Sequence, residues 1–258
     1  FREAIALRRR ELGADTPTVS GPLTNLGSMF LISSKLTEAE QVYQQVRAIE
    51  EKLPHPERSA NLGTTLHLLA LVCQRLDRIP EAIQHEQRSL AIRQRVFGKQ
   101  HWHVALSLTT LGELLRASGR SKEAKPLQER AVQIAAATWK EHPDLWWAQR
   151  ALARTRLELR EFSAAEAAMR TQSQVMRQRD EKPWLAETLE ILGAACAGRG
   201  DLKNAERHYT EAARLARDCL PAADADRRRT LRAFAAVLRK NGKTEQAARV
   251  EAELSPTR

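Results

Sequence analysis

The sequence predicts an all-α protein, a right-handed α-solenoid of stacked antiparallel helix hairpins. Three observations predict it: a small residue is followed by alanine twelve positions later, leucines recur at helical spacing, and glycine often lies seven positions after the small residue. The six small-residue and alanine pairs are Gly27/Ala39, Ala70/Ala82, Gly112/Ala124, Ala153/Ala165, Gly193/Ala205 and Ala235/Ala247. Their alanines lie 43, 42, 41, 40 and 42 residues apart, so the repeat period is about 42 residues.

Each repeat has the pattern of two amphipathic helices. In the repeat over 99–141, an apolar stripe at i, i+3 and i+4 is formed by Leu106, Leu108, Leu111, Leu114 and Leu115. Gly119, like its counterparts Gly200 and Gly242, is predicted to end the first helix. The small residue and the alanine let the two backbones approach, because a larger side chain there would overpack at a cost of about 1–3 kcal/mol.

Taken in chain order, residues 1–13 are predicted to be the second helix of a truncated repeat, because Ala4 has no upstream partner. Full repeats are predicted over 18–53, 57–98, 99–141, 142–182, 183–220 and 221–258. This makes residues 1–258 a single solenoid domain. The half-repeat would leave an apolar face uncovered, which predicts self-association and an origin in a larger protein. The polar last helix, followed by Ser-Pro, has the pattern of a terminal cap.

Composition restricts the classes of protein that remain. The chain has 258 residues, 42% of them hydrophobic, which is enough for a substantial core. It lacks an apolar run of roughly 20 residues and a secretory signal, so we expect no membrane contact and a cytoplasmic location. Cys73, Cys196 and Cys219 lie far apart, which predicts reduced, buried thiols rather than disulfides or a zinc site.

The net charge of +10 is spread evenly along the chain. Residues 1–141 carry 20 basic and 15 acidic side chains, and residues 142–258 carry 22 and 17. A nucleic-acid binder usually concentrates its charge in one patch or helix, whereas here arginines alternate with glutamates. We therefore interpret most charges as solvated helix surface. A basic solenoid associated with nucleic acid stays as the alternative, and steep salt dependence of binding would favour it.

The register Leu–small, glycine seven residues later and alanine twelve residues later resembles that of tetratricopeptide (TPR) repeats. The connectors over 12–27, 97–112 and 139–153 resemble the long-period subtype found in kinesin light chain and in many bacterial regulators. The resemblance implies a concave groove lined by first helices, which binds a protein or peptide partner. It also implies that the chain is the C-terminal regulatory or recruitment part of a larger bacterial signalling protein.

Helical geometry predicts which side chains face the groove, from their positions relative to the small residue. The candidate groove residues are Thr24, His67, Gln74, Arg75, Thr109, Arg116, Trp147, Arg150, Arg154, Arg232 and Arg239. Arginine pairs with carboxylates and phosphates, so Arg150, Arg154, Arg232 and Arg239 predict an acidic or phosphorylated partner. The alternative is that these arginines are ordinary exposed charges.

Signals for chemistry are weak. His101-Trp102-His103 could hold a metal but lacks a companion carboxylate or cysteine cluster, and His67 has no nucleophile or paired acid spaced to work with it. We predict no metal, no cofactor and no enzymatic activity. In kinesin light chain, asparagines form a ladder three residues before the small residue. Here these positions hold Thr24, His67, Thr109, Arg150, Glu190 and Arg232, so cargo binding of that type is not predicted.

Overall fold

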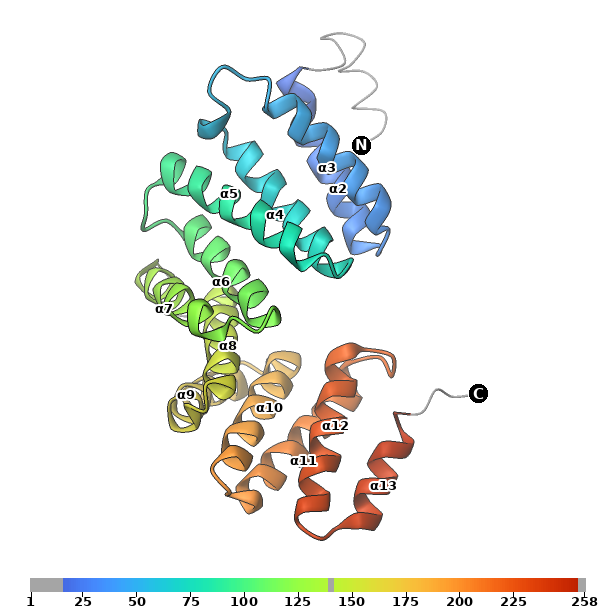
Figure 1. The fold of residues 1–258 in the computed structure, drawn as a ribbon. Coiled ribbons are helices and arrows are strands. Elements are labelled where there is room, and N and C mark those ends of the chain that lie inside the picture. Colours follow the sequence, from blue (N-terminus) through green and yellow to red (C-terminus); the bar gives the residue numbers. More distant parts are fainter. Residues whose placement is uncertain (1–15, 139–141, 255–258) are drawn as a thin grey trace. The chain divides into compact units, whose positions relative to one another are not determined.

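The computed structural model describes residues 16–138 and 142–254, and within these ranges the chain is all-helical. Consecutive α-helices form antiparallel pairs, as predicted (Figure 1). The pairs are α2 (Ser20–Ile32) with α3 (Leu36–Glu50), α4 (Ala60–Arg75) with α5 (Ile79–Phe97), α6 (Trp102–Ala117) with α7 (Ser121–Thr138), α8 (Pro143–Glu158) with α9 (Phe162–Gln178), α10 (Lys182–Gly198) with α11 (Leu202–Cys219), and α12 (Ala225–Lys240) with α13 (Thr244–Ala252). Two short 3-10 helices, η1 (Pro17–Val19) and η2 (Pro56–Arg58), precede α2 and α4. The helix predicted over 1–13 lies outside the described residues.

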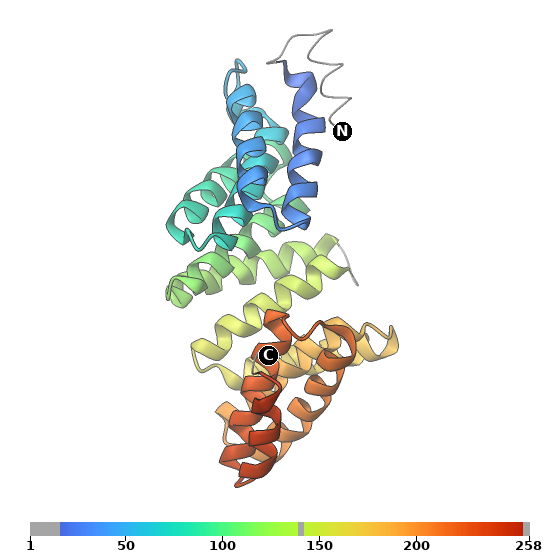
Figure 2. The same cartoon turned by 90° about the vertical axis from the view of Figure 1, so that its right-hand side faces the viewer.

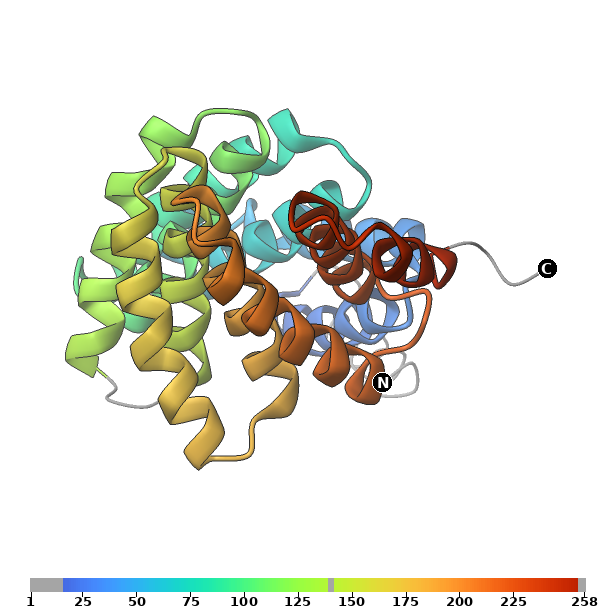
Figure 3. The ribbon, with the colours of Figure 1, turned by 90° about the horizontal axis from the view of Figure 1, so that it is seen from below.

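The chain divides into two compact units, Phe1–Ala148 and Gln149–Arg258, and the division falls inside α8. In the first unit each helix from α2 to α7 packs on the next one along the chain, and Figure 2 gives a second view of these pairs. In the second unit the same is true from α9 to α13, and Figure 3 shows α12 beside α13. None of the described helices combines the length and the apolar character needed to cross a bilayer.

The turn inside each hairpin repeats one backbone conformation. The residue seven positions after the small residue has a positive φ in all six described hairpins: Ser34 (58°), Asp77 (60°), Gly119 (78°), Arg160 (61°), Gly200 (83°) and Gly242 (75°). The next residue donates its N–H to the carbonyl five positions earlier, as from Arg120 to Leu115 at 2.8 Å. This is the Schellman arrangement, which satisfies the last carbonyls of a helix. The prediction that Gly119, Gly200 and Gly242 end helices is confirmed.

Three of these turns place a side chain where glycine is favoured. One of these side chains, Arg160, makes no hydrogen bond or ion pair with any described residue that a substitution would remove. Because a left-handed conformation costs an L-residue about 1–2 kcal/mol, Arg160→Gly should raise the free energy of unfolding by about 0.5–1 kcal/mol. Gly200→Ala should lower it by about 1 kcal/mol. Urea unfolding followed by circular dichroism measures both. A loss of stability in Arg160→Gly would contradict this account of the turns.

The small positions of the first helices permit the close approach that the sequence predicts. A Cβ atom built on Gly193 would lie 2.7 Å from the ring of Tyr209, and one on Gly27 would lie 2.5 Å from Tyr43. Real Cβ atoms essentially never come so near. Tyr209 and Met169 are 3% and 0% exposed, so both belong to the core.

The cysteines agree with the sequence analysis in part. Cys73 and Cys196 are buried free thiols, and burial raises the pKa of both, which keeps them protonated and unreactive. Cys219 ends α11 and is only half-buried, which corrects the prediction that all three are buried.

Candidate functional site

The predicted groove residues divide by exposure. Exposed or half-buried side chains belong to Thr24, Gln74, Arg75, Arg116, Trp147, Arg154, Arg232 and Arg239. His67, Thr109 and Arg150 are buried, with 7%, 1% and 1% of their surface exposed. This corrects the expectation that all eleven side chains line an open surface. The buried three fall on the face predicted for the groove, but packing against neighbouring helices covers them.

The buried polar side chains have specific partners. Thr109 donates its hydroxyl to the carbonyl of Ala105 at 3.0 Å, one helical turn back. His67 places Nδ1 2.8 Å from Oε2 of Glu86, a carboxyl group with no exposed surface. Glu86 is a polar contact that could not be selected from the sequence, because it lies on a second helix where four of the other repeats carry Tyr43, Gln128, Met169 and Tyr209 and the last carries Glu251.

Arg150 lies between an aromatic ring and a carboxylate. Its guanidinium is 4.3 Å from the ring centroid of Trp184, and its Nε is 2.9 Å from Oε2 of Glu187. Arg154, one turn along α8, places Nη2 2.9 Å from Oε1 of the same glutamate. Glu187 therefore joins two arginines of α8 to α10. Contact with the indole face and a carboxylate offsets the cost of burying the Arg150 charge.

Glu190, one turn further along α10, extends this arrangement to α12. Arg229 donates to it from Nε at 3.0 Å and from Nη2 at 2.8 Å, and also donates from Nη1 to Asp226 at 2.6 Å. Burial would lower the pKa of Arg229, but the bonds to Glu190 outweigh burial and raise it, so the guanidinium stays charged. We call these six residues the Arg–Glu ladder: Arg150, Arg154, Glu187, Glu190, Asp226 and Arg229.

The ladder balances three arginines against three carboxylates, so it presents no net charge. Arg150 and Arg154, predicted to hold an acidic partner, are bound to α10 instead. Arg239 is likewise paired, with Glu251 at 2.6 Å. Of the four arginines from which that partner was inferred, Arg232 alone has no ion pair or hydrogen bond within the part of the chain that the structure describes.

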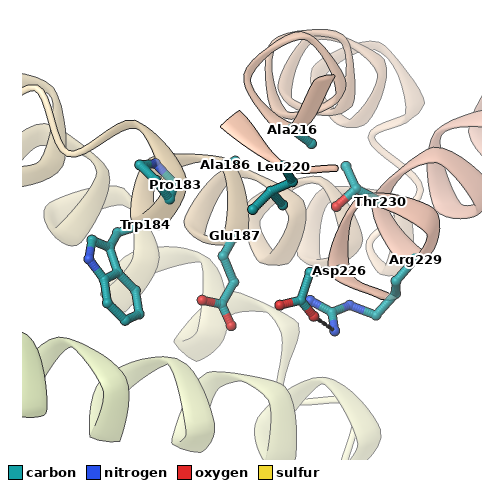
Figure 4. A pocket seen from close by; sticks show the side chains of 9 residues that line it. All are labelled: Pro183, Trp184, Ala186, Glu187, Ala216, Leu220, Asp226, Arg229 and Thr230. Atoms are coloured by element: carbon teal, nitrogen blue, oxygen red, sulfur yellow. Dashed lines mark hydrogen bonds and ion pairs between the residues drawn. The ribbon is translucent and has the colours of Figure 1, made fainter. Parts of the chain in front are cut away.

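A cleft of about 130 Å³ lies beside the ladder in the second unit, where α10, the end of α11 and the start of α12 meet (Figure 4). Pro183 lies in the first turn of α10, and Asp224 caps α12 by accepting backbone N–H bonds, so both helix starts lie at the edge of the cleft. The lining residues are Pro183, Trp184, Ala186, Glu187, Ala216, Leu220, Asp226, Arg229 and Thr230. In Figure 4 the side chains of Glu187 and Asp226 extend to the same side of the cleft. Sequence analysis gave no reason to select Asp226 or Thr230.

The first unit holds a second polar cluster, between α4, α5 and α6. Arg93 is 2% exposed and donates to Ser107 Oγ at 2.8 Å and to the carbonyl of His103 at 3.3 Å. Burial, followed by the positive charges of Arg93, His101 and His67, lowers the pKa of His103 to about 4. Its ring is therefore neutral at physiological pH. No three His, Cys, Asp or Glu side chains over 16–138 and 142–254 gather as metal ligands would.

This histidine should make stability depend on pH. Unfolded His103 takes up a proton near its ordinary pKa of 6.5, whereas the folded ring resists it until about pH 4, so the free energy of unfolding falls as pH falls between these values. Because the ring is partly exposed, we expect a loss of about 1–2 kcal/mol. His103→Phe, which keeps a ring but cannot titrate, should lose that much less than the parent protein in urea unfolding at pH 7 and pH 4.5. Equal losses in both proteins would contradict the assignment.

Comparison with known proteins finds the same kind of repeat in other chains. The tetratricopeptide repeat family model matches residues 61–137. No curated protein sequence matches the chain. The solved structures it resembles include a kinesin-light-chain protein of Podospora anserina with nearly identical TPR-like repeats, at 21% identity and TM-score 0.63, covering 78% of this chain and 95% of that one.

Two further structures match over a larger share of this chain. BtubC (BKLC) of P. vanneervenii has 19% identity and TM-score 0.66, with 88% of this chain and 93% of that chain covered. The apo form of RapI has 13% identity and TM-score 0.76, with 96% and 86% covered. At these identities the likeness concerns the fold. Together with the repeat register and the paired helices, it shows that the chain has a tetratricopeptide-repeat-like solenoid fold, with the family's own repeats matched over residues 61–137, and that it is similar in structure to kinesin-light-chain-like repeat proteins.

Proposed function

We propose that the chain is a scaffold for protein–protein interaction that binds a peptide or protein segment on the first-helix face of its second unit. This face consists of α10, α12 and the part of α8 from Gln149 onward. The observation that supports the proposal is the cleft beside the Arg–Glu ladder, which is built from two successive hairpins and leaves polar groups open to a ligand. A Rap protein complexed with Competence and Sporulation Factor has a similar fold, at 12% identity and TM-score 0.67.

The ladder itself supports a scaffold role. It joins the first helices of three consecutive hairpins through Glu187 and Glu190, and so holds their spacing constant when a ligand lies across them. Repeat arrays lack contacts between distant repeats, so such links between neighbours determine how rigid the face is.

The prediction of an acidic or phosphorylated partner is supported only by Arg232, because Arg150, Arg154 and Arg239 form ion pairs within the chain. No specific observation favours the nucleic-acid alternative, since many basic side chains already have carboxylate partners. We further propose that the chain serves as the recruitment part of a larger bacterial signalling protein in the cytoplasm. The similar fold of the quorum sensor NprR from B. thuringiensis, at 14% identity and TM-score 0.66, is compatible with that setting.

Site-specific photocrosslinking tests the proposed face. The photoreactive residue benzoylphenylalanine would replace Arg232 on α12 or, as a matched control, Thr210 on α11, both of which are exposed positions in the second unit. In cells of the parent organism, the Arg232 position should give a discrete crosslinked protein that the Thr210 position does not. Crosslinking at Thr210 alone, or at neither position, would contradict binding on the first-helix face.

A further inference from the structure

The size and the lining of the cleft in Figure 4 indicate what kind of group it can bind. Ligand sites for small molecules usually enclose about 300–1,000 Å³, and this cleft has about 130 Å³. That volume suits one side chain of a longer partner. Its walls are apolar at Pro183, Trp184, Leu220 and two alanines, which suits an aliphatic stem.

A largely buried threonine whose hydroxyl has no hydrogen-bond partner in the described part of the chain lines this cleft. Thr230 is 3% exposed, and its hydroxyl has no hydrogen bond to any described residue. Thr188, at the equivalent position of the preceding repeat, donates its hydroxyl to the carbonyl of Trp184 at 2.8 Å. Figure 4 shows the Thr230 oxygen on the side of its chain that faces Leu220, inside the cleft. Because Thr230 lines the cleft, its hydroxyl is open to hydrogen bonding with a ligand there.

Two carboxylates at the mouth of the cleft have room to accept further hydrogen bonds. Arg229 uses three of its five N–H donors on Glu190 and Asp226. Asp226 accepts one bond from that arginine, and its side chain is 57% exposed. Glu187 forms ion pairs with Arg150 and Arg154, one contact on each oxygen. A carboxylate offers about four acceptor positions, so both carboxylates can take further donors.

We propose that this cleft receives a lysine or arginine side chain of the bound partner. The aliphatic stem packs against the Trp184 and Leu220 walls, and the cationic head donates to Asp226, Glu187 and the Thr230 hydroxyl. Lysine and arginine carry donors and no acceptor, which matches the acceptors that are free here. An acidic side chain is less suited, because the charged side chains that line the cleft, Glu187, Asp226 and Arg229, carry one net negative charge. The inference rests on the proposed function for the partner, but the chemistry of the cleft can be tested alone.

The test is a titration of the whole chain with blocked amino acids, followed by NMR at the indole N–H of Trp184, assigned through Trp184→Phe. Nα-acetyl-lysine amide should shift this signal with a Kd on the order of 1 mM, as expected for so few ligand atoms. Nα-acetyl-norleucine amide, which keeps the stem but lacks the ammonium, should bind at least about tenfold more weakly. Nα-acetyl-glutamate amide should not bind.

Variants distinguish binding in the cleft from non-specific attraction of the lysine compound to surface carboxylates. Thr230→Val and Asp226→Asn should each weaken the lysine compound at least about threefold. Asp218→Asn is the matched control, because it removes an exposed carboxylate paired with Arg214 elsewhere in the second unit, and it should leave the Kd unchanged. Equal binding of the lysine, norleucine and glutamate compounds would overturn the proposal. So would equal effects of Asp226→Asn and Asp218→Asn, or the lack of a Trp184 shift at about 20 mM.

The two experiments fail independently. If Arg232 gives no crosslink but the lysine compound shifts Trp184, the proposed function is wrong and the chemistry of the cleft stands. If Arg232 gives a crosslink but Trp184 does not respond, the partner binds the first-helix face without a basic side chain in the cleft, and this inference alone is removed.

Discussion

Replacing Glu187 by alanine is expected to lower the free energy of unfolding by about 3–5 kcal/mol. Arg150 is 1% exposed and has the Glu187 carboxylate 2.9 Å from its Nε. Without that carboxylate, the guanidinium of Arg150 would stay buried away from water and would lose the negative charge that stabilises it. Arg154 would lose its 2.9 Å contact at the same time. For a unit of this size, the melting temperature should fall by roughly 10 °C or more.

An exposed ion pair in the same unit provides the control. Glu211 accepts from Nη1 and Nη2 of Arg177, at 2.5 and 2.6 Å, but the arginine side chain is 47% exposed. Glu211→Ala should therefore cost less than about 1 kcal/mol. If both substitutions cost the same, burial of Arg150 would not be the reason for the loss. Urea unfolding followed by circular dichroism gives both values.

A double substitution distinguishes the stability that the Arg150–Glu187 ion pair contributes from the cost of leaving Arg150 buried without its carboxylate. A buried ion pair replaced by apolar side chains of similar size is often neutral in stability. Arg150→Met together with Glu187→Met should recover most of the stability lost in Glu187→Ala. A double variant as unstable as Glu187→Ala would show that the ion pair itself contributes most of the energy.

The local features of the fold could be predicted because they depend on residues near one another in sequence. The twelve-residue offset predicted the hairpins, and the seven-residue offset predicted helix ends at Gly119, Gly200 and Gly242. The same position turned out to be left-handed at Ser34, Asp77 and Arg160, where the side chain gave no sign of it. Here the Schellman hydrogen bonds, present in every turn, determine the backbone conformation more strongly than the residue type does.

Burial and charge pairing could not be predicted from one helix at a time. Arg150 was predicted to face the groove, but it is buried, and its burial depends on Trp184 and Glu187 of the next repeat. A signal for such pairs does exist in the sequence. Many ion pairs join residues a little less than one period apart, including Glu40/Arg78, Glu51/Arg88, Arg150/Glu187, Glu190/Arg229, Glu206/Lys243 and Arg217/Glu253. Opposite charges at this offset, taken with the repeat register, would have indicated the ladder.

The side chain that lies opposite each small residue was also missed, although the small residues themselves were found. Where the small residue is glycine, a large side chain sixteen positions later covers it, in the pairs Gly27/Tyr43, Gly112/Gln128 and Gly193/Tyr209. The pairing has a steric cause, because the larger side chain occupies the volume that a Cβ would need.

Tyr209→Ala is expected to cost about 3–5 kcal/mol, the usual cost of removing a buried aromatic side chain. Tyr209 is 3% exposed and belongs to a core cluster that includes Phe234, Ala235 and Cys196. Gly193→Ala alone should cost about 1–3 kcal/mol, since its new methyl group would meet the tyrosine ring at 2.7 Å.

The two substitutions should not be additive. In the Tyr209→Ala background the methyl group of Gly193→Ala enters space that the ring has left, so its cost should fall below about 0.5 kcal/mol, and the higher helix propensity of alanine could make it favourable. The coupling energy should be about 1–3 kcal/mol. Tyr209→Ala with Gly112→Ala, a glycine of the first unit that faces Gln128, is the control pair and should be additive within about 0.5 kcal/mol. Additivity of Gly193→Ala with Tyr209→Ala in urea unfolding would mean that the glycine is required for some reason other than the ring opposite it.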